Sequence, residues 1–207
     1  MSSSDANLYK RGISGKDAAD IKVYKEEARF IRALCYYHAL DLYGNVPFVT
    51  ESNLVGGPLP QQISRADLFS YIENELLDIS DHIMTANSNE YGRADQAAVW
   101  SLLAKLYLNA QVYIGTAKYT ECITYCNKVI GAGYSLQPQY SNLFRSDNNG
   151  SPEMIFPINF DGLHTQGYGG MTFLIHASVG GSMNPADYGI NGGWYGLRTT
   201  KEFVGLF

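Results

Sequence analysis

Apolar side chains recur at intervals of three and four residues along four stretches between residues 17 and 130. This spacing places them on one face of an α-helix, so the sequence predicts a mainly α-helical protein. The four predicted helices cover 17–42, 64–84, 93–113 and 117–130. Gly44 and Pro47 are expected to end the first helix, and Ser64 is a favourable N-cap for the second.

The same periodicity predicts which side chains are buried. The expected buried face of the second helix is Leu68, Ile72, Leu76, Ile79 and Ile83. The expected apolar stripe of the first helix is Ile21, Tyr24, Ala28, Ile31, Cys35, Ala39 and Leu42.

The third and fourth predicted helices carry a repeat pattern. Trp100, Leu103, Ala104 and Tyr107 have the spacing of the first helix of a tetratricopeptide unit, in which a small residue lets the partner helix approach closely. The packing positions of the next helix are then Cys122, Cys126 and Val129, and a weaker echo occurs at Phe30, Ala33, Leu34 and Tyr37. The pattern predicts a tetratricopeptide-like helical-repeat scaffold of stacked helix pairs.

Composition changes near residue 150. Residues 160–207 hold 11 of the 21 glycines and only five charged residues. Glycine costs about 1 kcal/mol per helix site relative to alanine, so this stretch is expected to form loops and short strands and no regular helix. We therefore predict two parts, a helical-repeat region at 1–150 and an irregular region, rich in glycine and aromatic residues, at 151–207.

The charge balance excludes one class of partner. The net charge is -5, the isoelectric point is near 5.3 and basic residues are scattered, so no face is expected to bind nucleic acid. No apolar run is long enough to span a membrane. Glu26, Glu27, Arg29 and Arg32 are expected to form ordinary surface ion pairs worth a few tenths of a kcal/mol.

The sequence also argues against an enzyme. Glycoside hydrolysis requires two carboxylates, but no motif fixes a pair among Glu153, Asp161, Asp187 and Glu202. Motifs for serine hydrolases, phosphate-binding loops and zinc proteases do not occur. Cys35, Cys122 and Cys126 lack further ligands at zinc-site spacing and are expected to be small core residues. We predict no catalytic residues, no metal and no cofactor.

Several ordered motifs resemble the SusD/RagB family of nutrient-binding proteins. They are EEARFIRALCYYHALDLYGNVPFVTE at 26–51, YGRADQAAVWSLLAKLYLNAQVYIG at 91–115, KYTECITYCNKVI at 118–130, SPEMIFPINF at 151–160 and GGWYGLRTTKEFVGLF at 192–207. The SPEMIFPINF segment resembles a strand of that family. The resemblance covers nearly the whole chain.

The resemblance implies a surface-exposed lipoprotein of the Gram-negative outer membrane that binds glycan, or peptide in some members. Its expected partner is a SusC-like TonB-dependent transporter, and its expected contact with the membrane is only through a lipid anchor. Compared with full-length members, the chain is expected to be a fragment without the anchored N-terminal Cys and the C-terminal part.

Glycan binding requires flat rings that stack on sugars and planar polar groups that hydrogen-bond hydroxyl pairs. The loops of the second region supply these residue types, and the predicted ligand-binding set is His164, Gln166, Tyr168, Asn184, Asp187, Tyr188, Asn191, Trp194, Tyr195 and Arg198. Three alternatives remain open: a RagB-like peptide-binding member, a tetratricopeptide adaptor that binds a partner protein, and a glycoside hydrolase.

Overall fold

The computed structural model of the chain describes residues 5–53, 56–160, 164, 167 and 170–206. The chain divides into two compact units, unit 1 (Met1–Pro157) and unit 2 (Ile158–Phe207), and each is described by itself. Unit 1 contains the long helices, whereas unit 2 contains short helices joined by glycine-rich segments.

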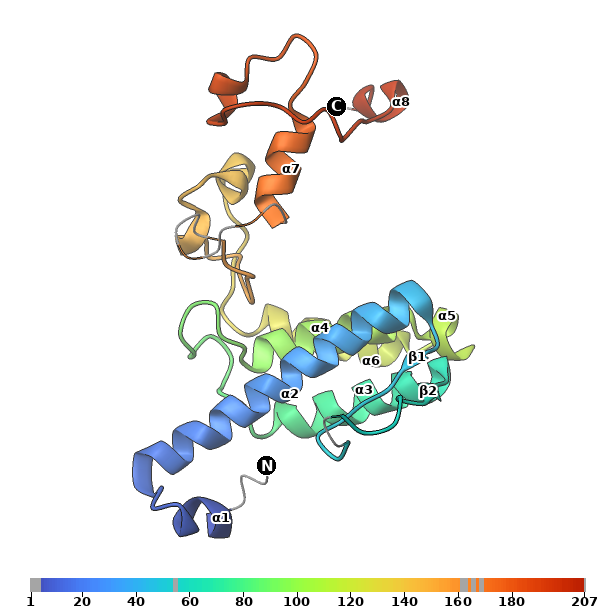
Figure 1. The fold of residues 1–207 in the computed structure, drawn as a ribbon, viewed down its shortest axis with the longest axis vertical. Coiled ribbons are helices and arrows are strands. Elements are labelled where there is room, and N and C mark those ends of the chain that lie inside the picture. The colour runs from blue at the N-terminus through green and yellow to red at the C-terminus, as the bar shows by residue number, and fades with distance from the viewer. Residues whose placement is uncertain (1–4, 54–55, 161–163, 165–166, 168–169, 207) are drawn as a thin grey trace. The chain divides into compact units, whose positions relative to one another are not determined.

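Unit 1 is a helical layer with one small sheet (Figure 1). Strands β1 (Val46–Pro47) and β2 (Gln62–Ile63) pair antiparallel, with Val46 opposite Ile63. Two short 3-10 helices, η1 (Tyr140–Phe144) and η2 (Asn148–Gly150), follow the last α-helix. The α-helices of this unit are α1 (Asp5–Lys10), α2 (Gly15–Tyr43), α3 (Arg65–Ser80), α4 (Gln96–Leu108), α5 (Ala110–Ile114) and α6 (Tyr119–Ile130).

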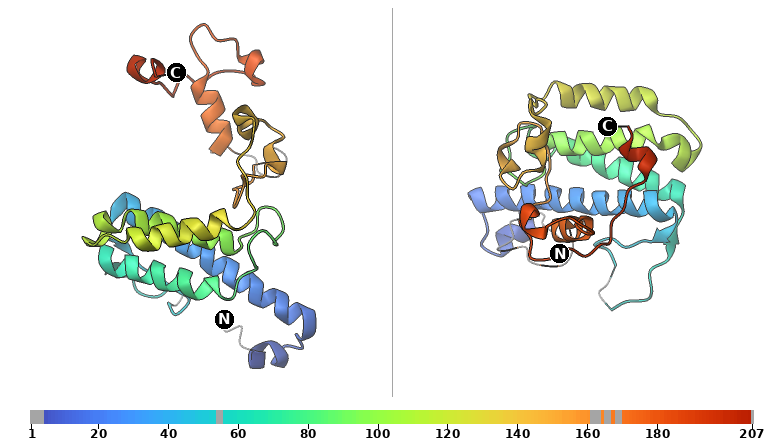
Figure 2. Two further views of the ribbon diagram at one scale, coloured as in Figure 1. Left: turned by 180° about the vertical axis from the view of Figure 1, so that it is seen from behind. Right: turned by 90° about the horizontal axis from the view of Figure 1, so that it is seen from above.

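Neighbouring helices of unit 1 pack side by side (Figure 2). Helix α2 packs along α3, α3 contacts α4, and α4 packs along α6. Helix α2 ends and α3 begins beside the β1–β2 sheet, so the two helices run in opposite directions (Figure 1). The predicted mainly helical fold is confirmed.

The start and the buried face of α3 and the end of α2 agree with the prediction, whereas α3 ends at Ser80, four residues before the predicted end at residue 84. Ser64 Oγ accepts a hydrogen bond from Asp67 N at 3.2 Å, which satisfies one of the free N–H groups of the first turn. Gly44 ends α2 with φ of +72°, and its N–H donates to Leu40 O. All five side chains of the predicted α3 face are buried, namely Leu68, Ile72, Leu76, Ile79 and Ile83.

The predicted stripe on α2 is wrong. Ile31 is 45% exposed and Leu42 is 69% exposed. Helix α2 carries two apolar stripes, and α3 and α4 cover the one that contains the weaker repeat echo. The side chains buried on α2 are Glu26, Phe30, Ala33, Tyr37 and Leu40.

Helix α4 packs through the residues of the repeat pattern, but of the three packing positions expected on α6 only Cys122 is buried, while Val129 is half-buried and Cys126 is exposed. Leu103, Ala104 and Tyr107 are buried, and the Tyr107 ring stacks on Tyr125 of α6 at a centroid distance of 5.8 Å. Trp100 is half-buried, and its Nε1 donates to Ser80 Oγ of α3 at 2.9 Å.

The expectation that all three cysteines are core residues holds only for Cys122. Cys35 and Cys126 are exposed.

The predicted third helix is shorter and is divided. Asp95 precedes α4 and caps it, since its carboxylate accepts hydrogen bonds from Ala97 N at 2.8 Å and Ala98 N at 3.2 Å. The helix therefore begins at Gln96, and Asn109 separates α4 from the short α5.

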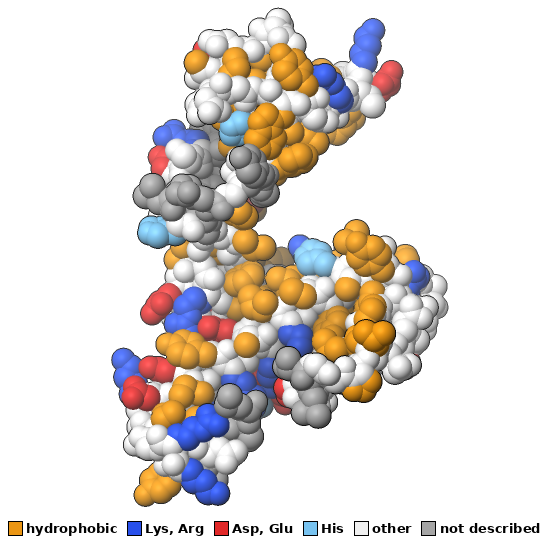
Figure 3. Space-filling view, viewed as in Figure 1, with side chains coloured by type: hydrophobic (Ala, Val, Ile, Leu, Met, Phe, Trp, Pro, Cys, Tyr) orange, Lys and Arg blue, Asp and Glu red, His pale blue; other side chains and the backbone are white. Residues whose placement is uncertain are grey.

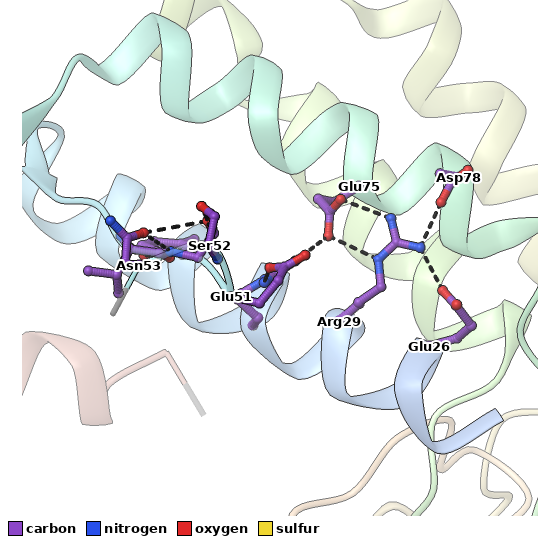
Figure 4. Close-up of polar contacts among 11 residues, drawn as sticks. Glu26, Arg29, Glu51, Ser52, Asn53, Glu75 and Asp78 are labelled. Carbon is purple, nitrogen blue, oxygen red and sulfur yellow. Dashed lines mark hydrogen bonds and ion pairs between the residues drawn. The ribbon is translucent and has the colours of Figure 1, made fainter. Parts of the chain in front are cut away.

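The arginines of α2 form a network that crosses to α3, so the expectation of ordinary surface pairs is wrong (Figure 4). Arg29 binds Glu26, Glu75 and Asp78 at 2.7–2.9 Å. Arg32 binds Glu75 at 2.8 Å and also pairs with Glu51.

Burial of the Glu75 carboxyl acts to raise its pKa. Hydrogen bonds from Arg29 and Arg32 outweigh that effect, so the pKa of Glu75 is lowered from its ordinary value. The network therefore holds Glu75 as a carboxylate between α2 and α3.

Unit 2 contains α7 (Gly170–Ser178), the 3-10 helix η3 (Pro185–Tyr188) and α8 (Lys201–Val204). The expectation of no regular helix is wrong for α7, because 171–178 is an apolar run without glycine. The expected short strands, including SPEMIFPINF, do not form in the described parts of 151–207. The surface of unit 2 shows many apolar and few charged side chains (Figure 3). Among the helices of the described residues, none has the length and apolar character needed to cross a membrane.

Candidate ligand-binding site

The segment that follows η3 returns along α7 and is fixed to it by backbone hydrogen bonds. Trp194 N donates to His176 O at 2.7 Å, and Leu197 N donates to Ala177 O at 2.8 Å. Tyr195 N donates to Val179 O at 3.3 Å. Ala177 and Val179 are buried beneath this segment. The backbone of 194–197 is therefore held in place by a helix, although it is neither helix nor strand.

Three rings gather where this segment meets α7. The Trp194 ring lies 4.6 Å from the His176 ring at an interplanar angle of 31°, and 6.4 Å from the Phe173 ring. His176 Nδ1 lies 2.9 Å from Thr172 O, one turn earlier in α7, so the imidazole orientation is fixed. Trp194 remains 39% exposed and Phe173 45% exposed. We call Phe173, His176 and Trp194 the ring cluster.

Glycines allow the close approach behind the ring cluster. A Cβ on Gly193 would overlap the carbonyl oxygen of Val179, whereas a Cβ on Gly192 would meet nothing within 4 Å. A Cβ on Gly180 would lie 2.5 Å from Cδ1 of Tyr195. Tyr195 itself has φ of +59°, a left-handed conformation that non-glycine residues rarely adopt. Strained positions of this kind are concentrated at functional sites.

Polar side chains of η3 form a second small group. Asn184 precedes η3, and its Oδ1 accepts from Ala186 N at 3.4 Å. Its Nδ2 donates to Asp187 Oδ1 at 3.1 Å, so an amide and a carboxylate lie side by side and exposed. Tyr188 ends η3 and is also exposed.

The structure locates eight of the ten predicted ligand-binding residues. Trp194 and Tyr195 lie against the α7 side of unit 2, and Asn184 and Asp187 form the amide–carboxylate pair. The side chains of His164, Tyr188, Asn191 and Arg198 are exposed. Gln166 and Tyr168 lie outside the described residues. Whether any of the ten contacts ligand stays a prediction.

The prediction missed two members of the ring cluster, Phe173 and His176. Both lie in the segment that was expected to be irregular. Their spacing of three residues would have placed them on one helix face, had the glycine-free run been recognised as a helix.

The carboxylates considered for hydrolysis do not form a pair within either unit as described. Glu153 belongs to unit 1 and accepts a hydrogen bond from Gln137 N at 2.9 Å. Asp187 accepts a hydrogen bond from Asn184, and Glu202 lies exposed on α8. Asp161 is outside the described residues. In the described ranges, no group of three His, Cys, Asp or Glu side chains could hold a metal ion. The arrangement offers rings and hydrogen-bonding groups for non-covalent binding.

Comparison with known proteins gives clear similarities. The chain is 40% identical over 173 residues to the starch-binding protein SusD of Bacteroides thetaiotaomicron, a match that covers 82% of this chain and 31% of that protein. No family model matches the chain.

Solved structures agree with this match. A SusD superfamily protein from Parabacteroides distasonis has a TM-score of 0.60 and 28% identity over 73% of this chain and 33% of its own. Surface glycan-binding protein A from Bacteroides thetaiotaomicron, in complex with laminarihexaose, has a TM-score of 0.54 and 22% identity over 74% of this chain and 32% of its own. The chain thus spans about a third of the length of the proteins it matches.

Proposed function

Because the chain belongs to the SusD-like family, we propose that it is part of a non-catalytic surface protein that captures a glycan. The family and the helical fold predicted from the sequence are confirmed by these matches. A relative with 40% identity is a starch-binding protein, and the protein of one similar structure was captured with laminarihexaose. Both ligands are glucose polymers, so a neutral oligosaccharide is the proposed ligand class.

The ring cluster is the observation that carries the proposal. A sugar ring presents C–H groups on its faces, and these pack against flat aromatic side chains with a gain from burial and dispersion. Trp194 and Phe173 are large, exposed and backed by α7, so they lose little freedom when a ligand arrives. The Asn184–Asp187 pair supplies the planar groups that hydrogen-bond adjacent hydroxyls.

Delivery to a SusC-like TonB-dependent transporter at the outer membrane, with attachment through a lipid anchor, is the second part of the proposal. This part rests on the resemblance to the SusD/RagB family, to which the 40% identity with a SusD protein lends weight. In this arrangement the helical layer of unit 1 would hold the transporter, while the ring cluster of unit 2 would hold the ligand. A peptide ligand of the RagB type is the main competing reading of the site.

The experiment is affinity electrophoresis of this chain and of the full-length protein through gels that contain starch or laminarin. Isothermal titration with maltohexaose, laminarihexaose and a pool of short peptides follows. We expect retardation by at least one polysaccharide, binding of the matching hexasaccharide and no release of reducing ends. Binding to peptides alone would replace glycan by peptide as the ligand. Sustained release of reducing ends would favour the alternative that the protein is a glycoside hydrolase.

Capture of the transporter is tested separately. The full-length protein is expressed with and without its neighbouring TonB-dependent transporter gene, and the membrane fraction is solubilised in mild detergent. We expect co-purification of the two proteins. Separate elution would contradict the delivery step and would leave glycan binding untouched.

A further inference from the structure

A cleft of about 310 Å³ lies in unit 1, lined in part by Asn89, Tyr91, Arg93, Asp95, Tyr134 and Met154. We propose that this cleft is a second carbohydrate site, separate from the ring cluster, which takes a single sugar ring of a neutral oligosaccharide. The proposal rests on the glycan-binding function proposed above. Pockets for small molecules commonly measure about 300–1,000 Å³, so the cleft suits one ring better than a longer stretch of chain.

The cleft is formed where three connecting segments meet at the helical layer. The segment between α3 and α4 supplies residues 87–95, the segment after α6 supplies 133 and 134, and residues 149–157 close the remaining wall. Binding residues are commonly found on loops that a rigid scaffold positions. Gly133 and Asn87 both have positive φ, +87° and +57°, which marks sharp turns at two places on the rim.

Asp95 ties these segments together at the base of the cleft. Its side chain is buried, its Oδ1 accepts from Ala97 N and Ala98 N, and its Oδ2 accepts from Asn87 N at 2.7 Å. Tyr134 OH donates to the same Oδ2 at 3.3 Å, which links the segment after α6 to the start of α4. The floor is therefore organised before any ligand arrives, and preorganisation lowers the entropic cost of binding.

The hydroxyl of Tyr134 is suited to a sugar. Burial, with the nearby Asp95 carboxylate, raises the pKa of Tyr134 to about 12, so the hydroxyl stays protonated at neutral pH. With its hydrogen directed to Asp95, the oxygen has lone pairs that accept from a ligand hydroxyl.

Arg93 places a guanidinium group in the wall of the cleft. Arg93 Nη2 lies 2.9 Å from Glu27 Oε1, and its guanidinium lies 4.9 Å above the Tyr24 ring. On the open side, Arg93 Nη1 is 3.5 Å from Glu90, whose side chain is 81% exposed. Such a long, exposed pair is weak, and a ligand hydroxyl can replace Glu90 at small cost.

Tyr91 supplies the stacking surface at the rim, since its side chain is half exposed. Met154 and Ile155, which also line the cleft, add apolar contact area. A flat ring, apolar contacts and hydroxyl, amide and guanidinium groups are together the chemistry that recognises a sugar ring.

The test is a two-dimensional NMR titration of the ¹⁵N-labelled chain with maltohexaose and, separately, laminarihexaose. We expect at least one probe to shift amides of 89–95, 133–134 and 149–155 in a saturable way. Tyr91→Ala is expected to lower the affinity obtained from these shifts about 2- to 10-fold. Tyr91→Phe, which retains the ring, is expected to keep the affinity. Tyr43→Ala is the matched control, because Tyr43 is an exposed tyrosine at the end of α2 that does not line the cleft.

The location of the shifts separates the two proposals. Shifts at 172–197 with none at the cleft, for both probes, would overturn the second site and leave the ring cluster standing. Cleft shifts alone would support the second site and remove the ring cluster from the binding function. Cleft shifts that Tyr91→Ala and Tyr43→Ala change equally would also overturn the proposal, because the rim tyrosine would then have no specific role.

Discussion

Arg29 of α2 and Glu75 of α3 face each other across the helix interface and form two parallel bonds, Nε–Oε2 of 3.2 Å and Nη2–Oε1 of 2.9 Å. Arg32, three residues further along α2, donates to the same carboxylate at 2.8 Å. A carboxylate held by two guanidinium groups fixes how α2 and α3 lie along their length, because parallel bonds to a planar group have a defined geometry. The side chains of Arg29, Arg32 and Glu75 are mostly buried, so these bonds are less screened than surface pairs.

Removing Glu75 tests the weight of this contact. We expect Glu75→Ala to lower the free energy of unfolding by about 1–3 kcal/mol, because two partly buried arginines lose their shared partner. This range lies between the values for exposed and fully buried pairs. Urea unfolding followed by circular dichroism measures it.

The matched control is Asp147→Ala, which breaks the exposed Arg145–Asp147 pair. We expect this control to leave the urea midpoint unchanged. Equal losses in the two variants would show that the network of α2 and α3 contributes no more than a surface pair.

The same carboxylate predicts a pH dependence. The pKa of Glu75 is lower in the folded chain than its ordinary value of 4.5, so the folded state binds fewer protons than the unfolded state. Its contribution to stability is therefore complete above about pH 4.5 and is lost as the pH falls through the lower folded value. We expect the melting temperature of Glu75→Gln to fall less steeply than that of the unmodified chain below pH 4.5. Parallel curves would contradict the assignment of this pH dependence to Glu75.

The contrast between α2 and α3 shows how far periodicity reaches. On α3, spacing alone identified Leu68, Ile72, Leu76 and Ile79 as buried, although it missed Phe69, which is also buried. Helix α2 has two apolar stripes, and only the position of α3 and α4 decides that Phe30 and Leu40 are inside while Ile31 and Leu42 are outside. Glu75, the partner of Arg29 across the helix interface, lies 46 residues away in sequence, which no local spacing reveals.

The residues of the candidate site were likewise only partly predictable from the sequence. Trp194 and Tyr195 were identified by residue type and loop context. Phe173 and His176 were missed because the glycine content of the whole tail hid the eight residues that form most of α7. Which rings gather depends on the return of 194–197 along α7, and that return depends on backbone bonds that side-chain patterns do not encode.

Alanine substitution at two adjacent glycines is expected to have different consequences. A methyl group on Gly193 would overlap the carbonyl oxygen of Val179, so Gly193→Ala must push the 194–197 segment away from α7. Gly192→Ala meets nothing within 4 Å and is the matched control. We expect Gly193→Ala alone to shift the indole N–H resonance of Trp194 and to weaken glycan binding. If both variants bind like the unmodified chain, the backbone bonds of Trp194 do not position the ring cluster.

Trp194→Ala is the most direct test of the ring cluster. Removing the indole takes away the largest exposed ring together with its contact to His176, and we expect affinity for the bound hexasaccharide to fall about tenfold. Trp194→Phe retains a flat ring and should lose less. Phe144→Ala removes an exposed ring of unit 1 that lies in neither proposed site, and it should bind normally. Titration calorimetry gives the three affinities, and circular dichroism confirms that each variant is folded. An affinity unchanged in folded Trp194→Ala would show that the sugar is held elsewhere, since stacking on this ring is the main contact that the proposed site offers.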